Sequence, residues 1–234
     1  QLKSCFVQEK ILLIMQVQLQ QIIVPPGQQI LMTDISWEMY EQILAAYEEK
    51  SGSRINYSQG VLEIMVPLPE HEADKVIISD LIKILLEELD QDFWSLGSTT
   101  FRSQKMQRGL EADDCFYIEN ETAIRGKKRI DLDVDPPPDL ALEIDITART
   151  RFDTYQMLGV KELWRFDGTI LEINVLEAGK YVQVEESPHF LGFPLGEVIP
   201  EYLQRSKTEG RNKIMKAFRR WVRTKIEQLN PPRF

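Results

Sequence analysis

The strongest chemical signal in this sequence is an acidic segment at residues 139–147. Side chains alternate across a strand, so the apolar residues at 140, 142, 144 and 146 share one face, whereas Asp139, Glu143 and Asp145 share the other. Glu143 and Asp145 would lie roughly 7 Å apart, close enough to border one site. Asp139 would lie roughly 13 Å from Glu143, too far to grip the same ion, so we interpret it as the start of the strand.

Carboxylates that converge on one pocket repel each other unless a cation lies between them. The acidic face of this strand would therefore suit a cation site. The alternative is an amphipathic strand with its acidic face in water.

A second group of acidic residues precedes another apolar segment, within residues 111–118. Adjacent strand residues face opposite ways, and Phe116 and Ile118 share the parity of Asp114. Asp114 is therefore expected on the core side, and Asp113 on the side that a neighbouring site could use. The alternative is a polar turn before a strand.

The sequence gives little support for a histidine- or cysteine-based metal site, a nucleophilic cysteine or a phosphate-binding loop. The chain has two histidines and two cysteines, so any metal would have to be held by carboxylates. His71 is expected in a polar turn at a helix start, and His189 in a loop after Pro188. Cys115 is expected to be a small buried hydrophobic residue. No glycine-rich phosphate loop of the P-loop or Rossmann type occurs in the sequence.

The elements that must position these acids follow from hydrophobic periodicity and turn residues. Helices are expected at about 36–50, 70–89, 151–158, 196–203 and 211–228. Strands are expected near 54–57, 61–66, 93–102, 115–119, 140–147, 162–166, 170–176 and 181–185. The first two strands are joined through Ser58-Gln59-Gly60 as a hairpin. This order describes one α/β domain with a mixed central sheet and helical flanks.

Composition excludes several classes of protein. With 43% hydrophobic and 28% charged residues in 234, wholesale disorder is not expected. The longest apolar run near the start covers residues 11–15, far short of the roughly 20 residues of a membrane span. Two cysteines cannot form a disulfide framework, and no signal-type cleavage site follows an apolar segment, so we expect a cytoplasmic protein.

The net charge of −9 conceals a basic tail. Residues 205–234 carry ten Lys or Arg against two Glu, a net charge of +8. The other residues carry 18 basic against 35 acidic side chains, a net charge of −17. Such a tail could bind a phosphate backbone. The alternative is a solvated helix that docks on the acidic body or on a partner chain.

Taken together and in order, these motifs resemble the Uma-type branch of the PD-(D/E)XK nuclease superfamily, which has the restriction-endonuclease-like fold. The resemblance spans about residues 33–185. The segments that carry it are Gly60-Val61-Leu62-Glu63-Ile64-Met65, Pro69-Glu70-His71-Glu72, Glu111-Ala112-Asp113, Pro137-Pro138-Asp139-Leu140 with Glu143, Tyr155, Gly159-Val160 and Glu162-Leu163-Trp164.

The resemblance implies a metal-dependent endonuclease that acts on nucleic acid, with DNA as the expected substrate. Asp113 would match the first acidic metal ligand of the superfamily, and Glu143 the acidic residue of its second motif. Glu70 or Glu72 could match the acid that many members add from the first core helix. Mg²⁺, or Mn²⁺ in its place, suits such a site because Mg²⁺ takes one or two carboxylates and keeps several waters.

Two departures from the superfamily pattern bear on activity. Ala112 replaces the proline of the Pro-Asp pair, and Asp145 stands where the superfamily normally has its lysine. In the Uma-type branch this lysine often moves to the next helix, four residues before the tyrosine that corresponds to Tyr155. That position is Arg151, which could stabilise charge but could not act as a base at neutral pH. Lys161 is a weaker substitute because it follows the Gly159 helix stop.

The loss of the lysine keeps a second interpretation open, in which the protein is a catalytically degenerate module that binds nucleic acid or protein. We expect three regions: an extension at 1–24, a restriction-endonuclease-like domain at 25–204 and a basic C-terminal helix within 205–234. The chain does not begin with Met, and Met15 is a hypothetical true start. Cutting both strands of a duplex would favour a two-fold homodimer.

Overall fold

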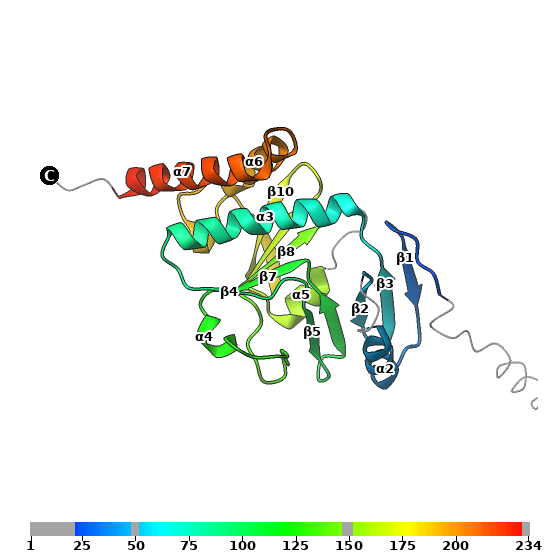
Figure 1. Cartoon of the computed structure of the whole chain (residues 1–234). Coiled ribbons are helices and arrows are strands. Elements are labelled where there is room, and N and C mark those ends of the chain that lie inside the picture. The colour runs from blue at the N-terminus through cyan, green and yellow to red at the C-terminus, as the bar shows by residue number, and fades with distance from the viewer. Residues whose placement is uncertain (1–21, 48–51, 147–151, 231–234) are drawn as a thin grey trace, which may run out of the picture.

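The computed structural model of the protein describes residues 22–47, 52–146 and 152–230. Within these ranges the strands form two sheets (Figure 1), whereas the sequence pattern predicted one. The smaller sheet has five strands, in the order β1 (Gln29–Met32), β3 (Val61–Met65), β2 (Arg54–Ser58), β6 (Arg108–Glu111) and β5 (Thr100–Ser103). The larger sheet has six strands, in the order β11 (Lys180–Val184), β10 (Leu171–Glu177), β9 (Glu162–Phe166), β8 (Leu140–Ile144), β7 (Asp114–Tyr117) and β4 (Trp94–Ser95).

Helices flank the sheets and connect their strands. They are α2 (Trp37–Tyr47), α3 (Pro69–Glu88), α4 (Glu121–Ile124), α5 (Phe152–Leu158), α6 (Leu195–Glu209) and α7 (Arg211–Leu229), with a short 3₁₀ helix η2 (Pro188–Phe190). In the larger sheet β8 and β9 run parallel and the other neighbours run antiparallel. The α/β class with a mixed sheet, predicted from the sequence, is confirmed.

The hairpin of β2 and β3 shows how local sequence sets the smaller sheet. Gln59 and Gly60 between the two strands both have positive φ, of 46° and 89°, as a two-residue type I′ turn requires. The predicted hairpin is therefore confirmed, with Ser58 paired to Val61 at its end.

Both faces of the larger sheet are buried. Leu140, Leu142 and Ile144 of β8 belong to a core that α3, α6 and α7 complete. Ala141 of the same strand belongs to a second core on the opposite face, together with Tyr155 of α5. The alternative of an acidic β8 face in water is therefore wrong, because other elements cover that face.

Several expected elements differ from the observed ones. The segment 93–102, expected as one strand, is split into β4 of the larger sheet and β5 of the smaller one. Gly97 lies between them with φ of 63°, a conformation that breaks a strand and suits glycine. Strands β1 and β6 were not expected. Both are four residues long and depend on pairing with the distant β2–β3 hairpin.

Helix α7 lies along α3 (Figure 1), and several of its cations pair with acids of that helix. Arg211 contacts Asp80, and Arg219 and Arg223 both contact Glu88. Its apolar stripe adds Ile214 and Phe218 to the core around α3. Of the two interpretations of the basic tail, the structure therefore supports docking on the acidic body for these side chains.

In the part of the chain that the structure describes, no helix is long and apolar enough to span a lipid bilayer.

Candidate active site

The two acids singled out in the sequence lie side by side in the larger sheet. β7 and β8 are antiparallel, with Asp114 opposite Leu142. One residue further along this register Asp113 lies opposite Glu143, and residues opposite each other on antiparallel strands share a face. Asp113 also accepts a hydrogen bond from the backbone N–H of Ile144, at 2.6 Å. Folding thus brings together two carboxylates that are thirty positions apart in the chain.

Asp113 is completely buried, and its charge is compensated by two side chains from outside the larger sheet. Arg54 of β2 forms an ion pair with one carboxylate oxygen. His71, in the first turn of α3, places Nε2 3.1 Å from the other oxygen. A buried carboxylate is tolerated when it is paired and hydrogen-bonded in this way.

Of the two glutamates at the start of α3, Glu72 is the one that joins the site. It accepts a hydrogen bond from Arg54 Nη2 at 2.9 Å and contacts Lys75. Its hydrogen bond with His71, followed by those cations, lowers the pKa of Glu72 to about 2. Glu70 points outward, with 66% of its side chain exposed, and lies 3.8 Å from Lys207.

Glu143 of β8 lines a cavity and accepts a hydrogen bond from the Tyr155 hydroxyl of α5. Burial raises the pKa of its carboxyl to about 8, against the opposing effects of Arg54 and Tyr155. A carboxyl in such surroundings loses its proton readily only when a cation lies close to it.

Asp145 occupies the position of the superfamily lysine. It carries no positive charge and forms an ion pair with an arginine instead. Arg165 of β9 donates Nε to it at 2.7 Å, and a second guanidinium nitrogen also contacts it. Arg165 lies 3.3 Å from Glu172 and 4.6 Å from the ring centre of Phe152. Arg151, the expected substitute for the lysine, lies outside the described residues.

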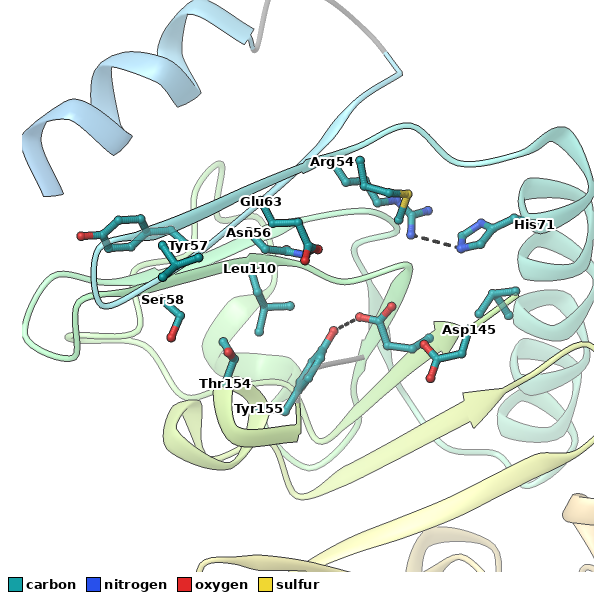
Figure 2. A pocket seen from close by; sticks show the side chains of 14 residues that line it. Arg54, Asn56, Tyr57, Ser58, Glu63, His71, Leu110, Asp145, Thr154 and Tyr155 are labelled. Carbon is teal, nitrogen blue, oxygen red and sulfur yellow. Dashed lines mark hydrogen bonds between the residues drawn. The ribbon is translucent and has the colours of Figure 1, made fainter. Parts of the chain in front are cut away.

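The cavity beside these acids has about 50 Å³ of free space, room for a few water molecules. Among its lining side chains are Arg54, Asn56, Glu63, His71, Glu143 and Asp145 (Figure 2). Within the described ranges no three His, Cys, Asp or Glu side chains are grouped to hold an ion by themselves. Glu143 in this small cavity, with Asp113 opposite it across the strands, nevertheless fits Mg²⁺, which prefers one or two carboxylates and keeps several waters. The role of Asp113 and Glu143 as metal ligands stays a prediction.

Sequence reasoning missed two side chains of this site. His71 was expected in a polar turn, but it is 1% exposed and packs against Asp113. Arg54 was read only as the first residue of a strand. The sequence did contain one indication of its role: Arg54, Asn56 and Ser58 alternate with apolar residues along β2 and therefore share one polar face. That pattern shows a polar face but does not show which element the face meets.

Residues 37–206 match the Uma2 family, described as "Putative restriction endonuclease". Among solved structures, the chain is similar to a protein of Anabaena variabilis ATCC 29413 described as "a putative nuclease belonging to DUF820". The two are 13% identical, the match covers 64% of this chain and 90% of that one, and the TM-score is 0.46. No curated protein matches the sequence at a significant level.

Proposed function

Because the chain belongs to the Uma2 family of restriction-endonuclease-like proteins, we propose that it is a metal-dependent endonuclease that hydrolyses phosphodiester bonds of DNA. The proposed cofactor is Mg²⁺ or Mn²⁺, held by Asp113 and Glu143, and the proposed compartment is the cytoplasm. The observation that carries the proposal is the register of β7 and β8, which places Asp113 opposite Glu143, a side chain that lines the cavity. A divalent cation there would polarise a phosphate and lower the pKa of an attacking water.

Backbone and side-chain groups of the protein hold the two carboxylates in place. The Ile144 N–H and His71 Nε2 hold Asp113, so its carboxylate has one orientation. The Tyr155 hydroxyl holds Glu143. Hydrogen bonds that hold the carboxylates in place favour metal binding, because the ligands themselves then need little reorientation.

Plasmid cleavage with Mg²⁺ or Mn²⁺ tests the proposal. We expect the wild type to nick or cut the plasmid, and Asp113→Ala and Glu143→Ala to lose at least 10²-fold in rate, as removal of a transition-state contact commonly does. Glu185→Ala is the matched control, because Glu185 is an exposed acid of the turn after β11. Equal traces from all four proteins would indicate a contaminant and defeat the proposal.

The second candidate function is a non-catalytic module on the same scaffold that binds nucleic acid or protein. Asp145 favours this second function, because it stands where the superfamily normally has its catalytic lysine. As an acid that accepts a hydrogen bond from Arg165, it cannot supply the positive charge of that lysine. Calorimetric titration with Mn²⁺ separates the two functions. The nuclease requires binding that weakens in Glu143→Ala, whereas the module predicts no binding that depends on Glu143.

Exposed cations of α7 allow a test of DNA as the substrate, through the salt dependence of DNA binding. Among the described residues, Lys216 and Arg220 of α7 are exposed and have no acidic partner within 4 Å, unlike Arg211. If they contact phosphates, the double substitution Lys216→Gln/Arg220→Gln lowers the slope of log affinity against log salt by about two, at about 0.9 per phosphate. Arg211→Gln is the matched control and should leave the slope unchanged. An unchanged slope in the double variant would show that these two side chains do not contact DNA phosphates and that α7 only docks on the body of the protein.

A two-fold homodimer that cuts both strands of a duplex is also part of the proposal.

A further inference from the structure

Arg54 is the one strong cation among the described residues that line the cavity. Its side chain is only 6% exposed, although arginine is rarely buried without a function or a partner. It comes from β2 of the smaller sheet, whereas both candidate metal ligands belong to the β7–β8 part of the larger sheet. The two sheets thus meet at this guanidinium, and Figure 2 shows it directed toward His71.

The guanidinium group contacts the acids of the site with two different nitrogens. Nη1 pairs with Asp113 and lies 3.5 Å from His71 Nε2, and Nη2 donates to Glu72 at 2.9 Å. Arg54 is therefore the counter-charge of the acidic cluster.

Three other cations near the site, all within the described ranges, have acidic partners of their own. Arg165 is held by Asp145, Glu172 and the Phe152 ring. Lys75 contacts Glu72 and donates to Ser98 at 3.2 Å. Lys161, at the opposite end of the β8–β9 pair from Glu143, contacts Glu119.

A divalent cation bound by Asp113 would take over the charge compensation that Arg54 now provides. The guanidinium would then be free to turn to a second anion in the same cavity. Arginine is suited to a phosphodiester because its planar fork donates two parallel hydrogen bonds to phosphate oxygens, although it cannot serve as a base.

We propose that Arg54 is the phosphate-binding cation of this site, supplied by β2 in place of the lysine that the larger sheet lacks. This inference rests on the proposed function and adds a catalytic residue to it. No bond is made or broken by Arg54. It neutralises the charge that develops on the phosphate oxygens.

The test compares Arg54→Gln, Arg54→Lys and the matched control Arg102→Gln, which loses an arginine of β5 paired with Glu41 outside the cavity. Plasmid cleavage at saturating Mn²⁺ gives kcat and KM, and calorimetry with Mn²⁺ alone gives metal affinity. For Arg54→Gln we expect kcat to fall by about 10²–10³-fold. Its Mn²⁺ affinity should be equal to or tighter than that of the wild type, because Asp113 loses a competing cation. Arg54→Lys should recover at least tenfold of the lost kcat, and Arg102→Gln should match the wild type.

The outcomes separate this inference from the proposed function. If the wild type does not cleave, the proposed function fails. If the wild type cleaves and Arg54→Gln keeps its kcat within threefold, Arg54 is not the phosphate-binding cation. A loss of Mn²⁺ affinity in Arg54→Gln equal to its loss of kcat would also overturn the inference. If thermal unfolding shows that Arg54→Gln does not fold, Arg54→Lys decides: a tenfold lower kcat with unchanged Mn²⁺ affinity supports the inference, and wild-type kcat contradicts it.

Discussion

Substitution of Phe218 by alanine tests whether α7 is part of the folded body. Phe218 is fully buried in the core formed with α3 and α6. Its ring centre lies 5.1 Å from that of Tyr202 and 5.4 Å from that of Trp221. Replacing a buried phenylalanine by alanine costs about 3–5 kcal/mol. Two aromatic neighbours place Phe218 in the upper part of that range, because each such pair adds about 0.5–1.5 kcal/mol.

We therefore expect Phe218→Ala to lower the free energy of unfolding by about 4–5 kcal/mol, a large share of the 5–15 kcal/mol by which an ordinary domain is stable. Urea unfolding followed by tryptophan fluorescence and far-UV circular dichroism measures it. Thr224→Ala is the matched control on the exposed side of α7, with an expected change within about 0.5 kcal/mol. A loss below about 1 kcal/mol for Phe218→Ala would refute the reasoning. It would mean that α7 is not docked in solution and that Arg219 and Arg223 are free to meet phosphate.

Two further predictions concern stability away from the cavity. Burial lowers the pKa of His189, but the hydrogen bond and charge of the buried Glu162 more than offset it, so its pKa is raised. The resulting stability is fully present below the unfolded pKa of about 6.5 and is lost as pH rises through the folded value. Urea unfolding at a series of pH values should show this fall in the wild type, and a His189→Gln variant with the same pH dependence would contradict it. In Gly109→Ala, the added Cβ would lie 2.1 Å from the buried Tyr40 hydroxyl, so we expect a lower melting temperature and a loss of about 1–3 kcal/mol. Wild-type stability of that variant would show that Tyr40 does not pack on β6 as described.

The elements with strong local patterns were predictable from the sequence. The helix expected at 70–89 is α3, because its apolar residues recur at helical spacing and Ile78, Leu81, Ile82 and Leu85 are all completely buried. The tail helix expected at 211–228 is α7 for the same reason. The division into two sheets was not predictable, because β6 pairs with β2 some fifty residues earlier and carries no alternating pattern of its own.

The acidic half of the site was predictable for a similar local reason. Alternation along β8 and the parity of Asp113 and Asp114 place Asp113 and Glu143 on one face once the two strands pair. The cationic half was not, because Arg54 and His71 reach Asp113 only after β2 and α3 pack against the larger sheet. His189 was expected in a loop, and its contact with the buried Glu162 depends likewise on tertiary packing.

The central claim is that Asp113 and Glu143 jointly hold one divalent cation. Anomalous scattering from crystals of the full chain soaked in Mn²⁺ tests it most directly. We expect one manganese peak about 2.1 Å from a carboxylate oxygen of each residue, with Arg54 turned away from Asp113. A structure with no manganese at this position, and with the Arg54–Asp113 ion pair intact at saturating Mn²⁺, would contradict it.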